Sequence, residues 1–401
     1  KALNNINSVT KIYDGSAVLT KENYQTGVGT ETVTLTYTAA SPLTGTYNYA
    51  ADQTPAAGKF ALALSGEGSG NYTVGTGTGD MVITSGELTL GDQTFTYNGG
   101  TTFTATVQGA DQEDITVTFK TDAKDAGTYT YSAESGSGTS YTASLSAEDA
   151  KKYSILTSGT LTIAPLTAAF NWNYSGPLAY TGSVQTVTAE VSNMADGDEA
   201  KDFALQYSGN TGTDASGYMA EVTGLGNSNY QLPAASEAQL AWAIGAMKVT
   251  KPAADTAAYT YSGDLQTYKL AENAAYTVSG NKQTEAGTYP VTVTLNNTGT
   301  QKNYVWADGS TEPAEYSFTI AKKALTPSVA SVDSKTYDGT DSATGKIALS
   351  GAVKEDKPAA EGTFSWAGFS AGTFRAYVTD ITLDEDSAKN YTLTASSLGV
   401  Q

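Results

Sequence analysis

Apolar residues and threonines alternate over short stretches throughout the chain. The clearest stretches are Val33–Tyr37, Ile115–Phe119 and Val291–Leu295. A period of two places one set of side chains on a buried face and the other set toward water, which is typical of a strand covered on one side. Helical periodicity is confined to 146–151 and 384–389, each long enough for a single turn. The pattern therefore predicts an all-β chain.

Short markers recur in a fixed order, which indicates an internal repeat. The first marker is Tyr-x-Gly, whose copies begin 84, 83, 81 and 76 residues apart. Its middle residue is Asp, Asn, Thr or Ser, all of which favour turns, and its glycine permits a positive φ. We expect a strand end, with the tyrosine in or beside the core. The five copies are Tyr13-Asp14-Gly15, Tyr97-Asn98-Gly99, Tyr180-Thr181-Gly182, Tyr261-Ser262-Gly263 and Tyr337-Asp338-Gly339.

Three further markers follow Tyr-x-Gly, the last of them in the first four copies only. A Gly-x-aromatic run opens an alternating stretch, a polar residue followed by tyrosine is expected to close the last hairpin, and an isoleucine ends the last strand. The Gly-x-aromatic runs are Gly58-Lys59-Phe60, Gly127-Thr128-Tyr129, Gly287-Thr288-Tyr289 and Gly372-Thr373-Phe374, with Gly217-Tyr218-Met219 in the third copy. The polar-Tyr pairs are Asn71-Tyr72, Lys152-Tyr153, Asn229-Tyr230, Asn303-Tyr304 and Asn390-Tyr391, and the isoleucines are Ile83, Ile163, Ile244 and Ile320.

The period of about 80 residues suits a small independent β-domain better than a solenoid unit. We expect five domains, called repeats 1 to 5 below, over 1–85, 86–165, 166–246, 247–323 and 324–401. The connections between them are only a few residues long, so each should limit bending between neighbours. Five units in line predict an elongated rod on the order of 150 Å long.

The second marker resembles the Asp-x-Gly-x-Tyr corner between strands E and F of immunoglobulin domains. Tyr129 and Tyr289 stand at the corner position, and Phe374 takes that place in repeat 5. A tyrosine there caps the bend by bonding its hydroxyl back to the chain. The chain has no cysteine and no repeated core tryptophan, so an antibody-type domain is excluded. The expectation is a tandem array of immunoglobulin-like β-sandwiches.

Repeats 1 and 5 resemble the YDG family of bacterial surface repeats, because Lys11–Gly15 and Lys335–Gly339 are each followed by an Asn-Tyr pair. Repeats 2 to 4 are similar to the related MBG repeats, although they lack the Asp of Tyr-Asp-Gly. The resemblance implies immunoglobulin-like sandwiches in large secreted or surface-attached bacterial proteins, often adhesin-like. It brings no catalytic residues.

Composition narrows the possible chemistry. With no cysteine and no histidine, the chain cannot form disulfides, Cys/His zinc sites or a Ser/His/Asp triad. The 22 basic and 41 acidic residues give a net charge of −19, which disfavours nucleic acid and anionic membranes as partners. No apolar run is long enough to span a bilayer, so we expect a soluble chain without membrane insertion.

Acidic loops are the remaining candidates for chemistry. The stretches 111–114, 196–202 and 384–386 do not repeat a pair of carboxylates as a glycosidase would need, so no catalytic residue and no enzyme activity is expected. Asp196, Asp198, Glu199 and Asp202 are the best Ca²⁺ candidates, but they match no full calcium loop, and a solvated loop is preferred. No cofactor is expected.

Lysines before Tyr-Asp-Gly raise the question of an isopeptide crosslink. Lys11 and Lys335 hold this place in repeats 1 and 5, whereas Thr96, Ala179 and Thr260 hold it elsewhere. A crosslink shared by all repeats is therefore excluded, and we expect exposed strand lysines.

These observations predict a non-catalytic structural or adhesive stalk, extracellular or on the bacterial cell surface, and a monomeric segment of a larger chain. Two alternatives stay open. One is a module that binds a host glycan or extracellular protein, and the other is a set of accessory repeats of a larger secreted enzyme.

Overall fold

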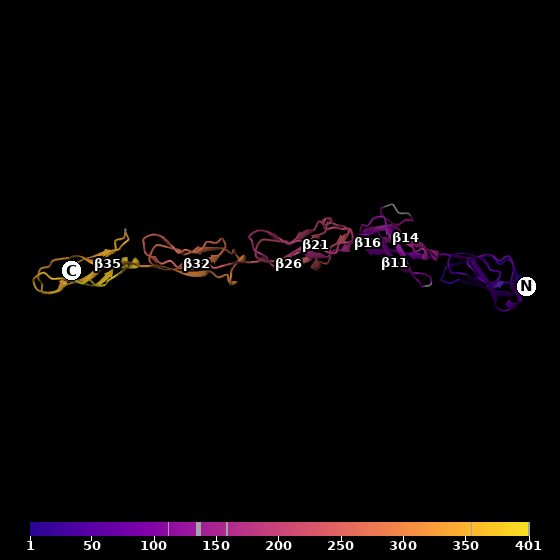
Figure 1. The fold of residues 1–401 in the computed structure, drawn as a ribbon, viewed down its shortest axis with the longest axis horizontal. Coiled ribbons are helices and arrows are strands. Elements are labelled where there is room, and N and C mark those ends of the chain that lie inside the picture. The colour runs from indigo at the N-terminus through magenta and orange to yellow at the C-terminus, as the bar shows by residue number, and fades with distance from the viewer. Residues whose placement is uncertain (111, 134–137, 158, 354, 400–401) are drawn as a thin grey trace. The chain divides into compact units, whose positions relative to one another are not determined.

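The computed structural model describes residues 1–110, 112–133, 138–157, 159–353 and 355–399. Strands make up 48% of the structure and helices 4%, so the predicted all-β class is confirmed. Figure 1 shows a ribbon made almost entirely of strands and loops. The chain divides into two compact units. Unit 1 holds 1–174, 187–210 and 219–240, and unit 2 holds 175–186, 211–218 and 241–401. Among the described residues, no helix is long and apolar enough to cross a membrane.

Two six-stranded sheets form most of unit 1. In repeat 1 the order is β2 (Val9–Ile12), β8 (Met81–Thr84), β5 (Gly45–Tyr49), β6 (Lys59–Ser65), β4 (Thr32–Ala39) and β3 (Val18–Gln25). In repeat 2 it is β10 (Gln93–Thr96), β16 (Thr160–Ala164), β13 (Gly127–Tyr131), β14 (Ser140–Leu145), β12 (Asp114–Thr121) and β11 (Thr102–Gln108). The remaining elements are β18 (Phe170–Trp172) paired with β21 (Ala189–Val191), β22 (Gln206–Ser208) paired with the end of β24 (Ser216–Gly224), the short 3-10 helices Ser69–Asn71, Asp149–Lys151 and Ala200–Asp202, and α1 (Ala235–Ala238).

Unit 2 is built from smaller sheets. Repeat 4 contributes a four-stranded sheet of β28 (Tyr259–Thr260), β34 (Ala314–Ala321), β32 (Gly287–Leu295) and β30 (Tyr276–Ser279). Repeat 5 contributes two three-stranded sheets, β37 (Gly345–Ser350) with β35 (Lys323–Val332) and β40 (Tyr391–Leu393), and β36 (Ser342–Ala343) with β38 (Ala360–Trp366) and β39 (Ala376–Leu383). The other elements are β19 (Leu178–Ala179) with β26 (Gln239–Gly245), β20 (Gln185–Thr186) with β23 (Thr211–Gly212), β29 (Gln266–Thr267) with β31 (Lys282–Gln283), and α2 (Ser387–Asn390).

The polar-Tyr marker does not close a hairpin, contrary to the sequence-based expectation. The strand at this marker instead runs parallel to the strand that opens the same repeat. The pairs are β1 (Ala2–Leu3) with β7 (Thr73–Val74), β9 (Gly86–Leu90) with β15 (Tyr153–Thr157), β17 (Leu166–Thr167) with β25 (Tyr230–Gln231), β27 (Met247–Val249) with β33 (Tyr304–Trp306), and β35 with β40. Parallel pairing brings the start of each repeat and its tyrosine to the same end of the fold.

The isoleucine marker lies in a closing strand that holds two other strands together. In repeat 2, Ile163 of β16 is opposite Phe95 of the parallel strand β10 and opposite Gly127 of the antiparallel strand β13. Ile83 and Ile320 occupy the same register in repeats 1 and 4. The closing strand therefore joins the segment before Tyr-x-Gly to the Gly-x-aromatic strand.

The alternating stretches point into the core as predicted. In β12, Ile115, Val117 and Phe119 are fully buried, whereas the threonines between them are exposed or half-buried. The apolar clusters also extend from one repeat into the next, because the cluster of repeat 1 includes Ile115 and Tyr153 of repeat 2.

One predicted marker is misplaced in repeat 1. Gly58-Lys59-Phe60 begins the hairpin partner β6, and Phe60 is a core residue. The corner is formed by Gly45-Thr46-Tyr47, where the Tyr47 hydroxyl donates to the Leu43 carbonyl at 2.7 Å. Both runs fit the Gly-x-aromatic pattern. The corner is identified by the hydrogen bond from the tyrosine hydroxyl back to the chain, which Phe60 cannot make.

Shortening the isoleucine side chain of the closing strand should destabilise its repeat. The Ile163→Ala variant removes a side chain that is 1% exposed, so we expect the free energy of unfolding to fall by about 2 to 5 kcal/mol. Urea unfolding followed by tyrosine fluorescence measures the change. Leu156→Ala, at a 51% exposed position of the same repeat, is the control and should change little.

Candidate functional site at the repeat joints

Each joint between consecutive repeats contains a pair of tyrosines that meet edge to face. One is the tyrosine of Tyr-x-Gly, and the other is the polar-Tyr tyrosine of the next repeat. The pairs are Tyr13–Tyr153 at 5.0 Å between ring centroids and 79° between ring planes, Tyr97–Tyr230 at 5.6 Å and 67°, Tyr180–Tyr304 at 5.4 Å and 82°, and Tyr261–Tyr391 at 5.4 Å and 80°. This is the geometry that aromatic quadrupoles favour, and such a pair contributes roughly 0.5–1.5 kcal/mol beyond its burial. We call these contacts joints 1 to 4; joints 1 and 2 lie in unit 1, and joints 3 and 4 lie in unit 2.

The glycine of Tyr-x-Gly turns the chain at the four joints and at the same place in repeat 5. All five glycines have φ between 77° and 81°, a range that residues with a Cβ adopt at a cost. At joint 2 a Cβ on Gly99 would also lie 2.1 Å from the Asp196 carbonyl oxygen of repeat 3. The glycine thus serves the turn and also the close approach of the next repeat.

A carboxylate binds both tyrosine hydroxyls at joints 2 and 4. At joint 2, Tyr97 and Tyr230 donate to Asp198 at 3.0 and 2.8 Å. At joint 4, Tyr261 and Tyr391 donate to Asp356 Oδ2 at 2.9 and 2.6 Å. The later tyrosine in each pair also accepts a bond from a backbone N–H three residues before the aspartate. Each phenol is therefore fixed in orientation, not only packed.

Burial and the neighbouring carboxylates change the acidity of these phenols. Burial, and then the hydrogen bond to Asp198, raises the pKa of Tyr97 to about 12. Burial and Asp356 raise the pKa of Tyr261 to about 12 in the same way. Both tyrosines consequently stay neutral, and able to donate, over the whole physiological range.

A second contact at joints 2 to 4 clamps the asparagine of the polar-Tyr pair. At joint 3, Asn303 Nδ2 donates to Asp214 Oδ1 at 2.9 Å, and its Oδ1 accepts from the Ala215 N–H at 2.7 Å. At joint 2 the same two bonds connect Asn229 with Asp125 and Ala126, and at joint 4 they connect Asn390 with Glu285 and Ala286. Both ends of the amide are satisfied by the preceding repeat, so the contact requires an asparagine side chain in one orientation.

The corner tyrosines donate hydrogen bonds to the loop that binds this asparagine. Tyr129 donates to the Asp125 carbonyl at 2.6 Å, Tyr218 to Asp214 at 2.7 Å, and Tyr289 to Glu285 at 3.0 Å. The residue whose carbonyl each tyrosine holds is therefore the acid that binds the asparagine of the next repeat. In repeat 5, Ser370 replaces the acid, and Phe374 has no hydroxyl to donate.

Joint 1 uses different side chains at the same positions. Lys152 replaces the asparagine, and its Nζ pairs with Glu113 at 2.7 Å within repeat 2. The corner of repeat 1 has Leu43 in place of the acid, and Thr44 instead donates through its N–H and its hydroxyl to the Lys151 carbonyl at 3.1 and 2.7 Å. The backbone contact therefore replaces the amide clamp, while the tyrosine pair is kept.

The predicted Ca²⁺ candidates take structural roles. Asp198 is nearly buried at joint 2, and Lys124 lies 3.5 Å from it. Asp202 accepts from the Glu199 N–H in a capping box around the short helix Ala200–Asp202. Among the described residues, no group of three or more acidic side chains could hold a metal ion. Asp111 lies outside the described residues.

Of the two lysines before Tyr-Asp-Gly, which were expected to be exposed, Lys11 is not and Lys335 is. Lys11 is buried, and its Nζ contacts the Asp14 carboxylate at 2.7 Å and the Val18 carbonyl at 2.6 Å. In the parallel pair of β2 and β8 it lies opposite Ile83. Lys335 makes the matching ion pair to Asp338 at 2.8 Å and is exposed.

A YDG domain is found at residues 321–398. This range contains Tyr337-Asp338-Gly339 and Asn390-Tyr391, two of the stretches that carry the resemblance. No curated protein matches the chain at a significant level. The YDG resemblance is thus confirmed for this range, while the MBG resemblance of repeats 2 to 4 stays a prediction.

Because the asparagine of the clamp faces a carboxylate, a negative charge at its position should destabilise the joint. Asn303→Asp replaces the donating Nδ2 by a carboxylate oxygen that faces Asp214, so the bond to Asp214 is lost and two like charges meet. We expect the free energy of unfolding to fall by at least about 2 kcal/mol, as measured by urea denaturation at pH 7. Asn171→Asp adds the same charge at an exposed position, and an equal loss there would contradict the clamp.

The phenols at joints 2 and 4 predict a stability loss in alkali. A phenol whose folded-state pKa lies above its unfolded value near 10 contributes stability that is complete below pH 10 and is lost as the pH rises through about 12. Thermal unfolding between pH 9 and pH 12 should therefore show a smaller decline for Tyr97→Phe than for the wild type. Asp198→Asn, which removes the charge beside the phenol and so lowers its folded pKa, should end the decline at a lower pH and make it smaller. If neither variant alters the profile, the carboxylate does not control this tyrosine.

Proposed function

We propose that the chain is a non-catalytic spacer, in which five immunoglobulin-like domains form an elongated array with stiff joints, in an extracellular or cell-surface bacterial protein. The observation that carries the proposal is the recurrence of one joint design. The tyrosine pair occurs at all four joints, and the asparagine clamp at three of them.

The joint contacts oppose bending in two ways. The tyrosine pair and the carboxylate at joints 2 and 4 form one contact, and the asparagine clamp on the corner loop forms a second. At joint 4 the first contact involves Tyr261 and Asp356, and the second involves Glu285 and Asn390. Two separate hydrogen-bonded contacts between the same two repeats restrict rotation that a single contact would allow.

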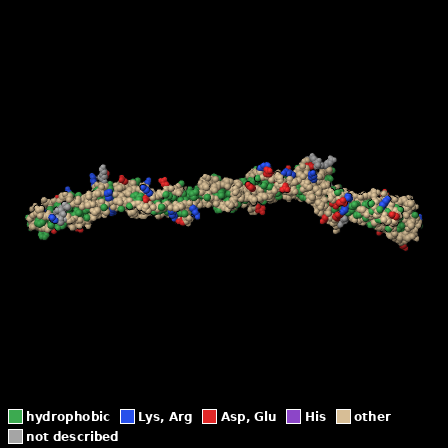
Figure 2. All heavy atoms as spheres, viewed as in Figure 1, with side chains coloured by type: hydrophobic (Ala, Val, Ile, Leu, Met, Phe, Trp, Pro, Cys, Tyr) green, Lys and Arg blue, Asp and Glu red, His purple; other side chains and the backbone are tan. Residues whose placement is uncertain are grey.

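The surface chemistry also suits a spacer. On the face shown in Figure 2, the charged side chains form small separate groups. Most of that face consists of backbone and uncharged side chains. The chain combines 16% charged residues with a net charge of −19, which favours solubility and disfavours self-association. Cores of valine, isoleucine and tyrosine without cysteine give each repeat a stability that does not depend on redox conditions.

Joint stiffness can be measured across a single joint. The chain contains no cysteine, so Lys248→Cys with Lys346→Cys places two unique fluorophores on repeats 4 and 5. We expect a narrow distance distribution in single-molecule energy transfer for the parent protein. Asn390→Ala with Tyr391→Ala removes both contacts of joint 4 and should broaden the distribution clearly.

The matched control is Asn296→Ala, whose amide donates to the Ala274 carbonyl within repeat 4. It should leave the distribution narrow. Small-angle scattering of the full chain should give a maximum dimension on the order of 150 Å. A broad distribution in the parent protein, or a compact scattering particle, would refute the stiff spacer.

A further inference from the structure

Two parallel strand pairs connect the first part of each of repeats 1 to 4 to its last part. The opening strand, which begins the repeat, lies beside the polar-Tyr strand, and the strand before Tyr-x-Gly lies beside the closing strand. In repeat 2 these pairs are β9 with β15 and β10 with β16. The tyrosine N–H then donates to the carbonyl of the last closing-strand residue: Tyr13 to Thr84 and Tyr97 to Ala164 at 2.8 Å, Tyr180 to Gly245 at 3.0 Å, and Tyr261 to Ala321 at 2.9 Å.

The direction of these strands determines how a repeat responds to a pull on the two ends of the chain. In repeat 2, tension that enters at Gly86 pulls β9 and β10 toward their amino ends, and tension that leaves at Ala164 pulls β15 and β16 toward their carboxyl ends. Because the partners are parallel, the two strands of a pair are pulled in opposite directions along a shared axis. The evenly spaced bonds of a parallel pair then carry the load together, whereas an antiparallel pair pulled from one end opens bond by bond.

The four repeats differ in the length of these pairs. Repeat 2 has five and four paired positions, and repeat 1 has two and four. Repeat 4 has three and two, and repeat 3 has two and two. The opening strand of repeat 2 is also fixed by Leu88 and Leu90, which are 4% and 1% exposed, whereas Leu166 of repeat 3 is half-buried. Sliding β9 would therefore take two buried leucines out of the core.

We propose that the chain bears tension along its length, and that repeats 1 to 4 unfold under load in a graded order that begins with repeat 3 and ends with repeat 2. Forced unfolding is governed by the unfolding rate, which rises when fewer bonds share the load. A repeat that unfolds adds roughly 250 Å of chain and so relieves the tension on the others. The load-bearing pairs lie inside the repeats, so this inference does not rest on the stiff joints of the proposed spacer.

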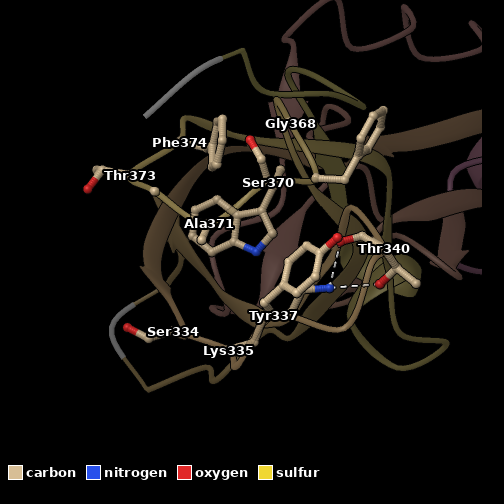
Figure 3. Close-up of a pocket in the computed structure, with 12 residues that line it drawn as sticks. Ser334, Lys335, Tyr337, Thr340, Gly368, Ser370, Ala371, Thr373 and Phe374 are labelled. Atoms are coloured by element: carbon tan, nitrogen blue, oxygen red, sulfur yellow. Dashed lines mark hydrogen bonds between the residues drawn. The ribbon is translucent and has the colours of Figure 1, made fainter.

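Repeat 5 differs from this series. It has the first pair, β35 with β40, but its Tyr-x-Gly segment lies outside the described strands. Side-chain bonds hold that segment, because Lys335 Nζ donates to the Thr340 carbonyl and hydroxyl at 2.9 and 2.7 Å (Figure 3). The order therefore concerns the four repeats in which both pairs are described.

Stretching the full chain by its two ends in an atomic force microscope tests the order. The chain has no cysteine, so an engineered disulfide can lock one repeat and identify its step. Thr94→Cys with Thr162→Cys joins paired positions of β10 and β16, which lie within the span of a disulfide. We expect the oxidised variant to lose the last or the second-last step of the trace, and dithiothreitol to restore it.

Thr167→Cys with Gln231→Cys locks repeat 3 in the same way. The two positions are paired, and Gln231 Nε2 donates to Thr167 Oγ1 at 2.9 Å. We expect this variant to lose the first or the second step. Because repeat 2 has more than twice as many paired positions under load, its step should need at least about 1.5-fold more force than that of repeat 3. Equal forces, or a stronger repeat 3, would overturn the proposed order.

A matched pair of proline variants tests whether β10 and β16 carry the load. Alternate residues of a parallel strand donate to the partner, so the bond from the Tyr97 N–H indicates that the Gln93 N–H faces β16 and the Thr94 N–H faces away. β10 lies at the edge of its sheet, where proline is tolerated if its nitrogen faces away from the partner. Gln93→Pro should lower the force of the repeat 2 step, and Thr94→Pro should change it much less.

The steps of the other repeats in the same trace are the internal reference for both variants. An equal effect of the two prolines would show that the strand pair does not carry the load, and would overturn the mechanism. Flexible joints would refute the spacer but would leave the order of the steps unchanged, so the two proposals can fail separately.

Discussion

The edge-to-face tyrosine pair is the contact on which each joint depends. One ring is the tyrosine of Tyr-x-Gly, which lies at one end of its repeat. The other ring begins the strand that pairs with the opening strand of the next repeat. At joints 1, 2 and 4 both rings belong to one apolar cluster, as Tyr13 and Tyr153 do in the cluster of repeat 1, so bending these joints would expose core surface. The joint is therefore coupled to the stability of the repeats on both sides.

Parallel strand pairing explains why the tyrosines reach the joint. The opening strand and the polar-Tyr strand begin at the same end of a repeat, and the Tyr-x-Gly segment and the closing strand finish at the other end. An antiparallel hairpin at either place would send one of the two tyrosines to the wrong end. The parallel direction of these strands thus gives a repeat one end that presents Tyr-x-Gly and another that presents the polar-Tyr pair.

The strands and the repeated markers can be predicted from the sequence, but the hydrogen-bond partners at the joints cannot. Alternation in Ile115–Phe119 predicts strand and burial correctly, because a period of two has one geometric meaning. The repeated Tyr-x-Gly and Asn-Tyr markers locate both halves of each joint. That Asn229 binds Asp125, 104 residues earlier, could not be read from either marker, because the contact depends on which ends meet. The hairpin expectation was wrong for the same reason, since a tyrosine after a turn looks alike in parallel and antiparallel pairs.

Repeats 1 and 5 show that the surroundings of the Lys-x-Tyr-Asp-Gly motif determine whether its side chains are buried. Lys11 and Lys335 make the same ion pair to the aspartate of Tyr-Asp-Gly, yet one is buried and the other exposed. Tyr13 is 3% exposed and packs against Tyr153, whereas Tyr337 is 67% exposed. The motif itself therefore encodes the turn and the lysine–aspartate pair. Burial of its tyrosine is supplied by two other elements, a closing strand beside it and the tyrosine of a following repeat above it. The same local geometry can thus hold its tyrosine in a core or leave it exposed.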